Sequence, residues 1–174
     1  MTTRDKESGM AETPSITIEP VDWSDQRAVA LRAAMDEEMG ARYASAWDGW
    51  DPEAAVRAQA ALAVDPADIA ATFLAVVDGQ AVGHAALRRL GDEWELKRVV
   101  TLPGHRGHGI SRALIAAVEA AAVAGGAERI ILQTGDRQPD AVRLYEWLGY
   151  RPMPIYPPYD VLPMSRCYAR ELIR

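Results

Sequence analysis

One short segment of the sequence has the residue types of an anion site: Arg106-Gly107-His108-Gly109-Ile110-Ser111. It lies between an apolar, β-branched run and an alanine-rich segment that is expected to be a helix. A helix start exposes backbone N–H groups and the positive end of the helix dipole, and glycine lets a ligand approach the backbone closely. The pattern therefore predicts an anion site that suits phosphate. The alternative is an ordinary strand-to-helix turn with solvated arginines.

Positive charge is concentrated around this segment, although the chain as a whole is acidic. The stretch from Lys97 to Arg112 contains four Lys or Arg residues, two histidines and no acid, whereas the formal net charge of the chain is −6. The overall charge argues against a nucleic-acid-binding protein. The nucleotide-binding motif G-x-x-x-x-G-K-[ST] is absent, and Arg112 stands where the dinucleotide motif G-x-G-x-x-G needs glycine.

Length and composition indicate one globular domain. The chain has 174 residues, of which 49% are apolar, and we expect residues 1–14 to be a tail and residues 15–174 to be the domain. No apolar run approaches the roughly 18 residues that a membrane span needs, and the N-terminus lacks the apolar centre of a signal peptide. The single cysteine, Cys167, excludes an intrachain disulfide and fits a reducing cytoplasm.

The apolar pattern predicts the elements that must position the glycine-rich segment. Asp78-Gly79 between two apolar runs predicts a hairpin turn. We expect Pro20 to close the first strand, Ser24 to cap the first helix and Gly40 to end it. The expected strands are 16–18, the two arms of the hairpin within 72–90, 93–102, 128–134, 150–156 and 163–172. The expected helices are 24–39, 52–63, 109–124 and 139–148. This order predicts a mixed sheet in an α/β-type domain, with a βαβ crossover at 94–134.

The strand before the glycine-rich segment changes phase. Trp94 and Leu96 share one face, Glu95 shares the other face with Lys97, and apolar character restarts out of phase at Val99. One extra residue in the strand would produce this slip, so the pattern indicates a β-bulge.

Taken together, these residues resemble the GCN5-related N-acetyltransferase (GNAT) superfamily. Residues 106–111 are similar to its [R/Q]-x-x-G-x-[G/A] motif, "ELKRVV" resembles its fourth strand, and "TGDRQPDAVRLYEWLGY" resembles its fifth strand end and following helix. The resemblance covers about residues 72–172 and is greatest to bacterial members. It implies a single-domain GNAT fold of the α/β (α+β-like) class. The sheet would be mixed and mostly antiparallel, with flanking helices and a central splayed parallel pair formed by strands 93–102 and 128–134.

The resemblance also implies an activity. The chain would be an acetyl-CoA-dependent N-acetyltransferase, in which a primary amine of an unidentified small molecule attacks the thioester directly in a ternary complex. Two alternatives stay open: a catalytically silent acetyl-CoA-binding sensor or interaction module, and an enzyme that acetylates protein N-termini or lysines. We expect a cytoplasmic location and neither a nucleic acid nor a membrane as partner, and the exposed late strands are compatible with a homodimer.

The cosubstrate contacts follow from the same resemblance. Backbone N–H groups of the glycine-rich segment would bind the diphosphate of CoA, and the pantetheine arm would lie along the bulged strand. Ser111 replaces the last Gly or Ala of the motif, and Gln138 stands where the family often has Asn. The implied contact residues are Val99, Val100, Thr101, Arg106, Gly107, His108, Gly109, Ile110, Ser111, Arg112 and Gln138.

Two side chains are candidates for catalysis. Tyr145 falls on the position of the family's thiolate-protonating tyrosine, although its helical spacing also fits a purely buried stripe. Glu95 lies on the strand beside the gap and is in position to accept the amine proton directly or through water. The alternative for Glu95 is a surface carboxylate paired with Lys97 or Arg98. A backbone N–H near Val99 would stabilise the oxyanion.

The remaining candidates have other expected roles. His105 and His108 lack companion ligands at zinc spacing, so no metal site is expected. His84 is expected to be a packed or hydrogen-bonded histidine. By the family's habit, Trp47, Trp50 and the segment 155–160 would wall the acceptor pocket.

Overall fold

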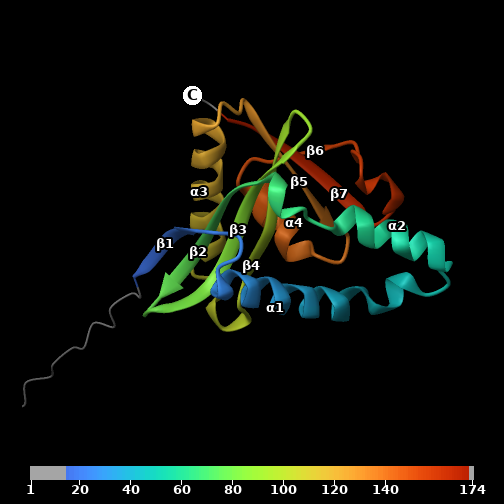
Figure 1. Cartoon of the computed structure of the whole chain (residues 1–174), viewed down its shortest axis with the longest axis horizontal. Coiled ribbons are helices and arrows are strands. Elements are labelled where there is room, and N and C mark those ends of the chain that lie inside the picture. The colour runs from blue at the N-terminus through green and yellow to red at the C-terminus, as the bar shows by residue number, and fades with distance from the viewer. Residues whose placement is uncertain (1–14, 173–174) are drawn as a thin grey trace, which may run out of the picture.

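The computed structural model describes residues 15–172, so the expected tail and residues 173–174 lie outside the described residues. Within this range the chain forms a seven-stranded sheet with helices on both faces (Figure 1). The strands are β1 Ile16–Val21, β2 Ile69–Val77, β3 Gln80–Leu90, β4 Glu93–Thr101, β5 Arg129–Gly135, β6 Arg151–Met153 and β7 Ser165–Glu171. The helices are α1 Gln26–Tyr43, α2 Pro52–Leu62, α3 Ile110–Ala124 and α4 Pro139–Trp147. None of the helices within residues 15–172 has the length and apolarity to cross a membrane.

The sheet has the mixed topology that the family resemblance implies. Its strand order is β1-β2-β3-β4-β5-β7-β6, and the pairing is antiparallel except between β4 and β5. The chain passes from β4 to β5 through α3, which is the predicted crossover. Asp78 and Gly79 have φ angles of 50° and 80°, as a hairpin turn between β2 and β3 requires. The predicted fold class is therefore confirmed.

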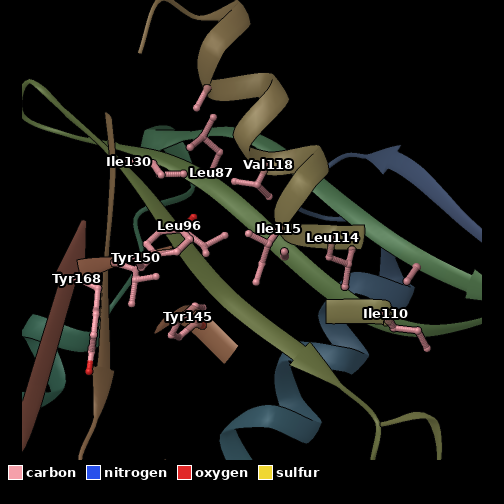
Figure 2. Packing of buried hydrophobic residues seen from close by; sticks show 14 of the residues in the cluster. Leu87, Leu96, Ile110, Leu114, Ile115, Val118, Ile130, Tyr145, Tyr150 and Tyr168 are labelled. Carbon is pink, nitrogen blue, oxygen red and sulfur yellow. The ribbon is translucent and has the colours of Figure 1, made fainter. Parts of the chain in front are cut away.

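The sheet is covered on its two faces by different helices. On one face, the apolar sides of α3 and α4 pack on the sheet in the main core (Figure 2). Members of this core include Leu114, Ile115 and Val118 of α3, Tyr145 of α4, and Leu87, Leu96 and Ile130 of the strands. On the other face, Ala28 and Leu31 of α1 pack on Leu74, Val76 and Val100. Strand β4 sends Leu96 to the first layer and Val100 to the second, because the one-residue register shift between them reverses the alternation of side chains.

Three predicted boundaries in two elements are wrong, and the first is Pro20 in β1. Strand β1 continues through Pro20 to Val21, with Pro20 opposite Phe73. Because β1 is an edge strand, the missing N–H of proline costs no ladder hydrogen bond on the solvent side.

The other two wrong boundaries are the two ends of α1. Its N-cap is Asp25 rather than Ser24, since the Asp25 carboxylate accepts a hydrogen bond of 2.8 Å from the N–H of Arg27. The helix also continues through Gly40 to Tyr43. Glycine in a helix costs about 1 kcal/mol, but the extra turn buries Tyr43, whose hydroxyl accepts a 3.0 Å hydrogen bond from the N–H of Arg137. Tertiary contacts thus outweigh the local stop signal.

Candidate functional site

A gap opens between the two parallel strands in the middle of the sheet. Pairing between β4 and β5 is restricted to Glu95 with Ile131 and Leu96 with Leu132. Beyond that point the register between β3 and β4 shifts by one residue, and Arg98 has a φ of 55°. A cleft of about 800 Å³ follows the bulge, with β4 on one side and β5 on the other. The predicted bulge and splayed pair are confirmed.

His84 on β3 holds the bulge in place. Its side chain is completely buried, and Nδ1 lies 2.7 Å from the carbonyl oxygen of Arg98. The guanidinium of Arg32 lies 3.1 Å from Nε2, and because a guanidinium only donates, Nε2 accepts and Nδ1–H donates to the bulge. Burial, helped by the two nearby arginines, lowers the pKa of His84 to about 4. The expected packed, hydrogen-bonded role is confirmed.

The His84 environment makes the stability of the protein depend on pH. Its pKa is lower in the folded state than in the unfolded chain, so this stabilisation is complete above pH 6.5 and lost as the pH falls towards 4. Between pH 7 and pH 5 the loss is expected to be about 2 kcal/mol of unfolding free energy from this residue. Urea denaturation at pH 5, 6 and 7 should show that the unfolding free energy of His84→Leu falls less steeply with decreasing pH than that of the wild type. The variant His108→Gln, at an exposed position, should keep the wild-type dependence on pH. An unchanged dependence of unfolding free energy on pH in His84→Leu would contradict this assignment.

The glycine-rich segment leads into α3 without filling the space above its backbone. Gly107 and Gly109 have φ angles of 80° and 79°, and no atom lies within 4 Å of the position of a Cβ on either residue. Gly109 is the N-cap and provides no side-chain cap, and the N–H groups of Ile110, Ser111 and Arg112 have no acceptor among the described residues. The start of α3 therefore presents exposed donors, as the sequence pattern predicts.

The predicted cofactor contacts separate into two groups. Six of them line the cleft: Val99, Val100, Thr101, Arg106, Ser111 and Gln138. The hydroxyls of Thr101 and Ser111 are 2.9 Å apart and join the end of β4 to α3. Gly107, His108, Gly109, Ile110 and Arg112 are outside this wall. The side chain of Ile110 is buried in the core, and the Arg112 guanidinium lies 5.4 Å from the ring centre of Trp147, so only the backbone of Ile110 can face a ligand.

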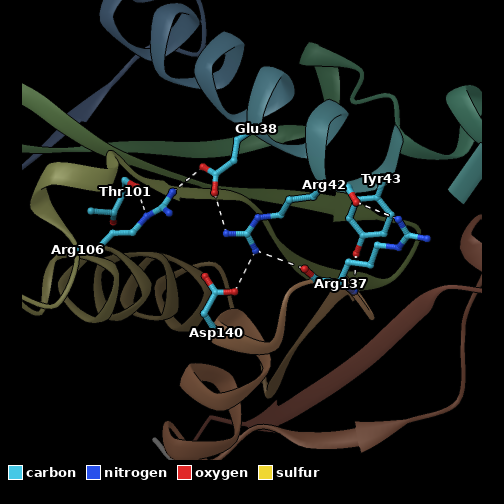
Figure 3. Close-up of polar contacts among 7 residues, drawn as sticks. All are labelled: Glu38, Arg42, Tyr43, Thr101, Arg106, Arg137 and Asp140. Carbon is cyan, nitrogen blue, oxygen red and sulfur yellow. Dashed lines mark hydrogen bonds and ion pairs between the residues drawn. The ribbon is translucent and has the colours of Figure 1, made fainter. Parts of the chain in front are cut away.

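A chain of ion pairs connects α1 to the glycine-rich segment and to α4 (Figure 3). Arg106 donates to Glu38 at 2.5 Å and to the carbonyl oxygen of Thr101 at 3.0 Å. Glu38 also accepts from Arg42 at 2.8 Å, and Arg42 pairs with Asp140 at 3.0 Å. The hydrogen bond from Arg106 is the main cause that lowers the pKa of Glu38. These contacts hold α1 against the cleft.

Tyr145 combines the two roles that its sequence position allows. Its ring packs in the main core, with its centre 5.8 Å from that of Tyr150, and the residue also lines the cleft. Burial raises the pKa of the Tyr145 hydroxyl above its ordinary value, so the hydroxyl carries its proton at neutral pH. It has no hydrogen-bond partner among the described residues. A protonated hydroxyl on the cleft wall has the properties of a general acid.

Glu95 is buried and committed to partners inside the protein. Arg88 donates to one carboxylate oxygen at 2.5 Å, and the hydroxyls of Tyr156 and Tyr159 donate to the other at 2.9 and 2.7 Å. Its side chain has no exposed area and is not part of the cleft wall. The alternative of a surface carboxylate paired with Lys97 or Arg98 is therefore wrong. The partner is Arg88, because the antiparallel register sets Arg88 opposite Glu95 on β3.

Sequence reasoning missed Lys97 as a site residue. Its side chain is 7% exposed and lines the cleft, and Nζ donates to the Tyr159 hydroxyl at 2.8 Å. Burial is the main cause that lowers the pKa of Lys97 to about 8. The available signal was the strand period, since Lys97 lies two residues after Glu95 on the same face.

The predicted aromatic wall is present in part. Trp47 lines the cleft, and the ring of Trp50 packs edge-on against the ring of Trp47.

Comparison with known proteins gives the relatives of this chain. A family model described as Acetyltransferase (GNAT) family matches residues 32–150. A solved structure from Klebsiella pneumoniae, named as an acyl-CoA N-acyltransferase, is 26% identical, with 91% of this chain and 98% of that chain covered and a TM-score of 0.71.

Two more distant structures show the shared fold alone. A GNAT-family acetyltransferase from Staphylococcus aureus is 19% identical, with 91% of this chain and 100% of that chain covered and a TM-score of 0.66. The PaiA N-acetyltransferase of Thermoplasma acidophilum, in complex with coenzyme A, is 17% identical, with 90% and 99% covered and a TM-score of 0.64. No curated protein gave a significant match to the sequence.

Proposed function

Since this chain belongs to the acetyltransferase (GNAT) family, we propose that it transfers an acetyl group from acetyl-CoA to a primary amine of a small molecule. The observation that carries the proposal is one continuous cleft, which runs along the gap between β4 and β5 and reaches Arg106 and Ser111 beside the exposed N–H groups of α3. This arrangement suits a diphosphate at one end and an extended arm that leads into the sheet. The free thiol of Cys167 fits a cytoplasmic location.

The chain's own residues supply binding groups along the cleft. The N–H groups at the start of α3 would bind the diphosphate, with Arg106 and Ser111 beside them. The backbone of Val99 to Thr101, which is free of β5, would bond the extended arm, and Gln138 would contact it from α4. Holding both substrates in the gap contributes to the rate because a bimolecular reaction becomes effectively unimolecular.

The reaction needs two proton movements and one charge stabilisation. The amine nitrogen bonds to the acetyl carbon while the carbon–sulfur bond breaks, and we assign donation of a proton to the departing thiolate to Tyr145. An N–H near Val99 would stabilise the oxyanion. We propose Glu95 as the acceptor of the amine proton, acting through water because its carboxylate is outside the cleft wall.

The test is incubation with acetyl-CoA and a panel of amines, with free thiol as the readout. Release that depends on a small amine would support the proposal. Tight binding of acetyl-CoA without thiol above the uncatalysed rate would favour a sensor, and release that needs a peptide N-terminus or lysine would favour a protein acetyltransferase.

The role of Tyr145 gives a specific prediction. Tyr145→Phe keeps the ring in its core position and removes the hydroxyl, so we expect kcat to fall about 10-fold with little change in the Kd for acetyl-CoA. The effect is modest for a general acid, because a thiolate of pKa near 8.5 leaves acceptably without one. Tyr150→Phe, a neighbouring tyrosine outside the cleft wall, is the control. A wild-type kcat in Tyr145→Phe would leave this residue with a packing role alone.

A further inference from the structure

The charged side chains of the cleft wall balance one another with one exception. Ion pairs join Asp36 to Arg98, Glu38 to Arg106 and Arg42, and Arg42 to Asp140. Among the described residues of the wall, Lys97 alone carries a charge without a carboxylate within ion-pair distance. A buried ammonium without a counter-ion is costly, so its presence on a cleft wall requires a reason.

The carboxylate nearest in the fold is already engaged. Glu95 accepts from Arg88, Tyr156 and Tyr159, and Tyr159 in turn donates to Glu95 while accepting from Arg88 and Lys97. Tyr159 therefore satisfies one N–H of the Lys97 ammonium, and two further N–H donors remain. With a pKa of about 8, the group stays mainly protonated at pH 7.

Lys97 is far from the end of the cleft that suits the diphosphate. It precedes Thr101, which contacts Arg106 and Ser111, by four strand residues, a separation of roughly 10–13 Å. The wall near Lys97 is largely apolar. Tyr159, which contacts Lys97, shares an apolar cluster with Leu162, and Trp47, Leu62 and Met164 pack against this cluster. Leu162, Trp47, Leu62 and Met164 all line the cleft.

We infer that the acceptor is an amine that also carries a carboxylate, and that Lys97 binds this carboxylate at the apolar end of the cleft. The inference rests on the proposed acetyl transfer and names its substrate class. The two remaining N–H donors of the Lys97 ammonium bind the carboxylate, the apolar wall contacts an apolar body, and the amine is directed towards the strand gap. A polycationic acceptor would meet an uncompensated positive charge here and would be disfavoured.

The test compares acceptors that differ only in the carboxylate. Leucine, leucinamide and 3-methylbutylamine share one apolar body, and phenylalanine, phenylalaninamide and 2-phenylethylamine form a second series. We expect kcat/KM for the amino acids to exceed that for their counterparts without a carboxylate by about 30-fold, since a charge-assisted hydrogen bond contributes on the order of 10- to 100-fold. Equal or higher kcat/KM for the amines without a carboxylate would overturn the inference.

Variants of the protein provide the second part of the test. Lys97→Met keeps the length of the side chain and removes its charge, and it should abolish the preference for the carboxylate by raising KM for the amino acids alone. Arg57→Met is the control, because it removes a positive charge from the exposed side of α2 outside the cleft. An equal loss of kcat for all acceptors in Lys97→Met would assign Lys97 to the reacting thioester and overturn carboxylate binding. If Lys97→Met does not fold, the wild-type acceptor series still decides.

Failure of the inference and failure of the proposed function give different results. Thiol release with amines that lack a carboxylate would preserve acetyl transfer and reject the substrate class. If no amine releases thiol, calorimetric titration of leucine and phenylalanine into the CoA-loaded protein is the deciding measurement. Binding that Lys97→Met weakens would retain the carboxylate site on a protein without acetyl-transfer activity, and no binding would reject both.

Discussion

Replacing Arg88 with methionine is expected to lower the free energy of unfolding by about 3–5 kcal/mol, because the buried Glu95 carboxylate would lose the guanidinium that pairs with it. Arg88 and Glu95 are 4% and 0% exposed and pair at 2.5 Å across β3 and β4. Removal of one partner of such a pair costs more than the pair itself contributes. The loss should appear as a lower urea midpoint with an unchanged m-value.

An ion pair on the surface, between the neighbouring strands β4 and β5, provides the matched control. Arg129 on β5 pairs with Glu93 on β4, and their side chains are 45% and 32% exposed. Arg129→Met should cost less than about 1 kcal/mol, since solvent screens the partner that remains. The double variant Arg88→Met/Glu95→Gln should recover part of the loss by removing the stranded charge. Equal midpoints for Arg88→Met and Arg129→Met would contradict the buried network.

The buried pair also matters for the cleft, because it fixes the group that orients Lys97. Arg88 and Glu95 together engage the Tyr159 hydroxyl, and that hydroxyl accepts from Lys97. Stability and acceptor recognition thus share one hydrogen-bonded cluster. Arg88→Met is therefore expected to change the acceptor preference of any protein that still folds, whereas Arg129→Met should leave it unchanged.

Local signals predicted the parts of the fold that depend on neighbouring residues. The Asp78-Gly79 turn, the phase slip before Val99 and the glycine-rich start of α3 each follow from backbone constraints within a few residues. For this reason the hairpin, the bulge and the exposed helix start agree with the expectations. The boundaries at Pro20 and Gly40 differ because an edge position and a tertiary contact changed the cost of a local stop signal.

Contacts between distant residues were beyond the reach of pattern analysis. Glu95 is bound by Tyr159, which is 64 residues away, and Arg106 by Glu38, which is 68 residues away. The partner of Glu95 depended on the register of β3 and β4, which places Arg88 beside it. The isolated charge of Lys97 is likewise defined only once every other charged side chain of the cleft wall has found its partner.

The most direct test of the diphosphate position is Gly109→Leu, which is expected to raise the Kd for CoA about 100-fold. The space beside Gly109 is open, and a leucine side chain there would keep phosphate oxygens out of reach of the first N–H groups of α3. Loss of two charge-assisted hydrogen bonds is enough for an effect of this size, since each contributes roughly 1.5–3 kcal/mol.

A matched variant separates the effect of backbone strain from the loss of phosphate binding. Gly79 in the β2–β3 turn has a φ of 80°, almost identical to the 79° of Gly109, and is equally open. Leucine at either position should cost about 1–2 kcal/mol of unfolding free energy, because both residues must adopt a left-handed conformation. Calorimetric titration with CoA should therefore distinguish two equally strained proteins. Gly79→Leu should bind like the wild type, and equal Kd values for the two variants would move the diphosphate away from α3.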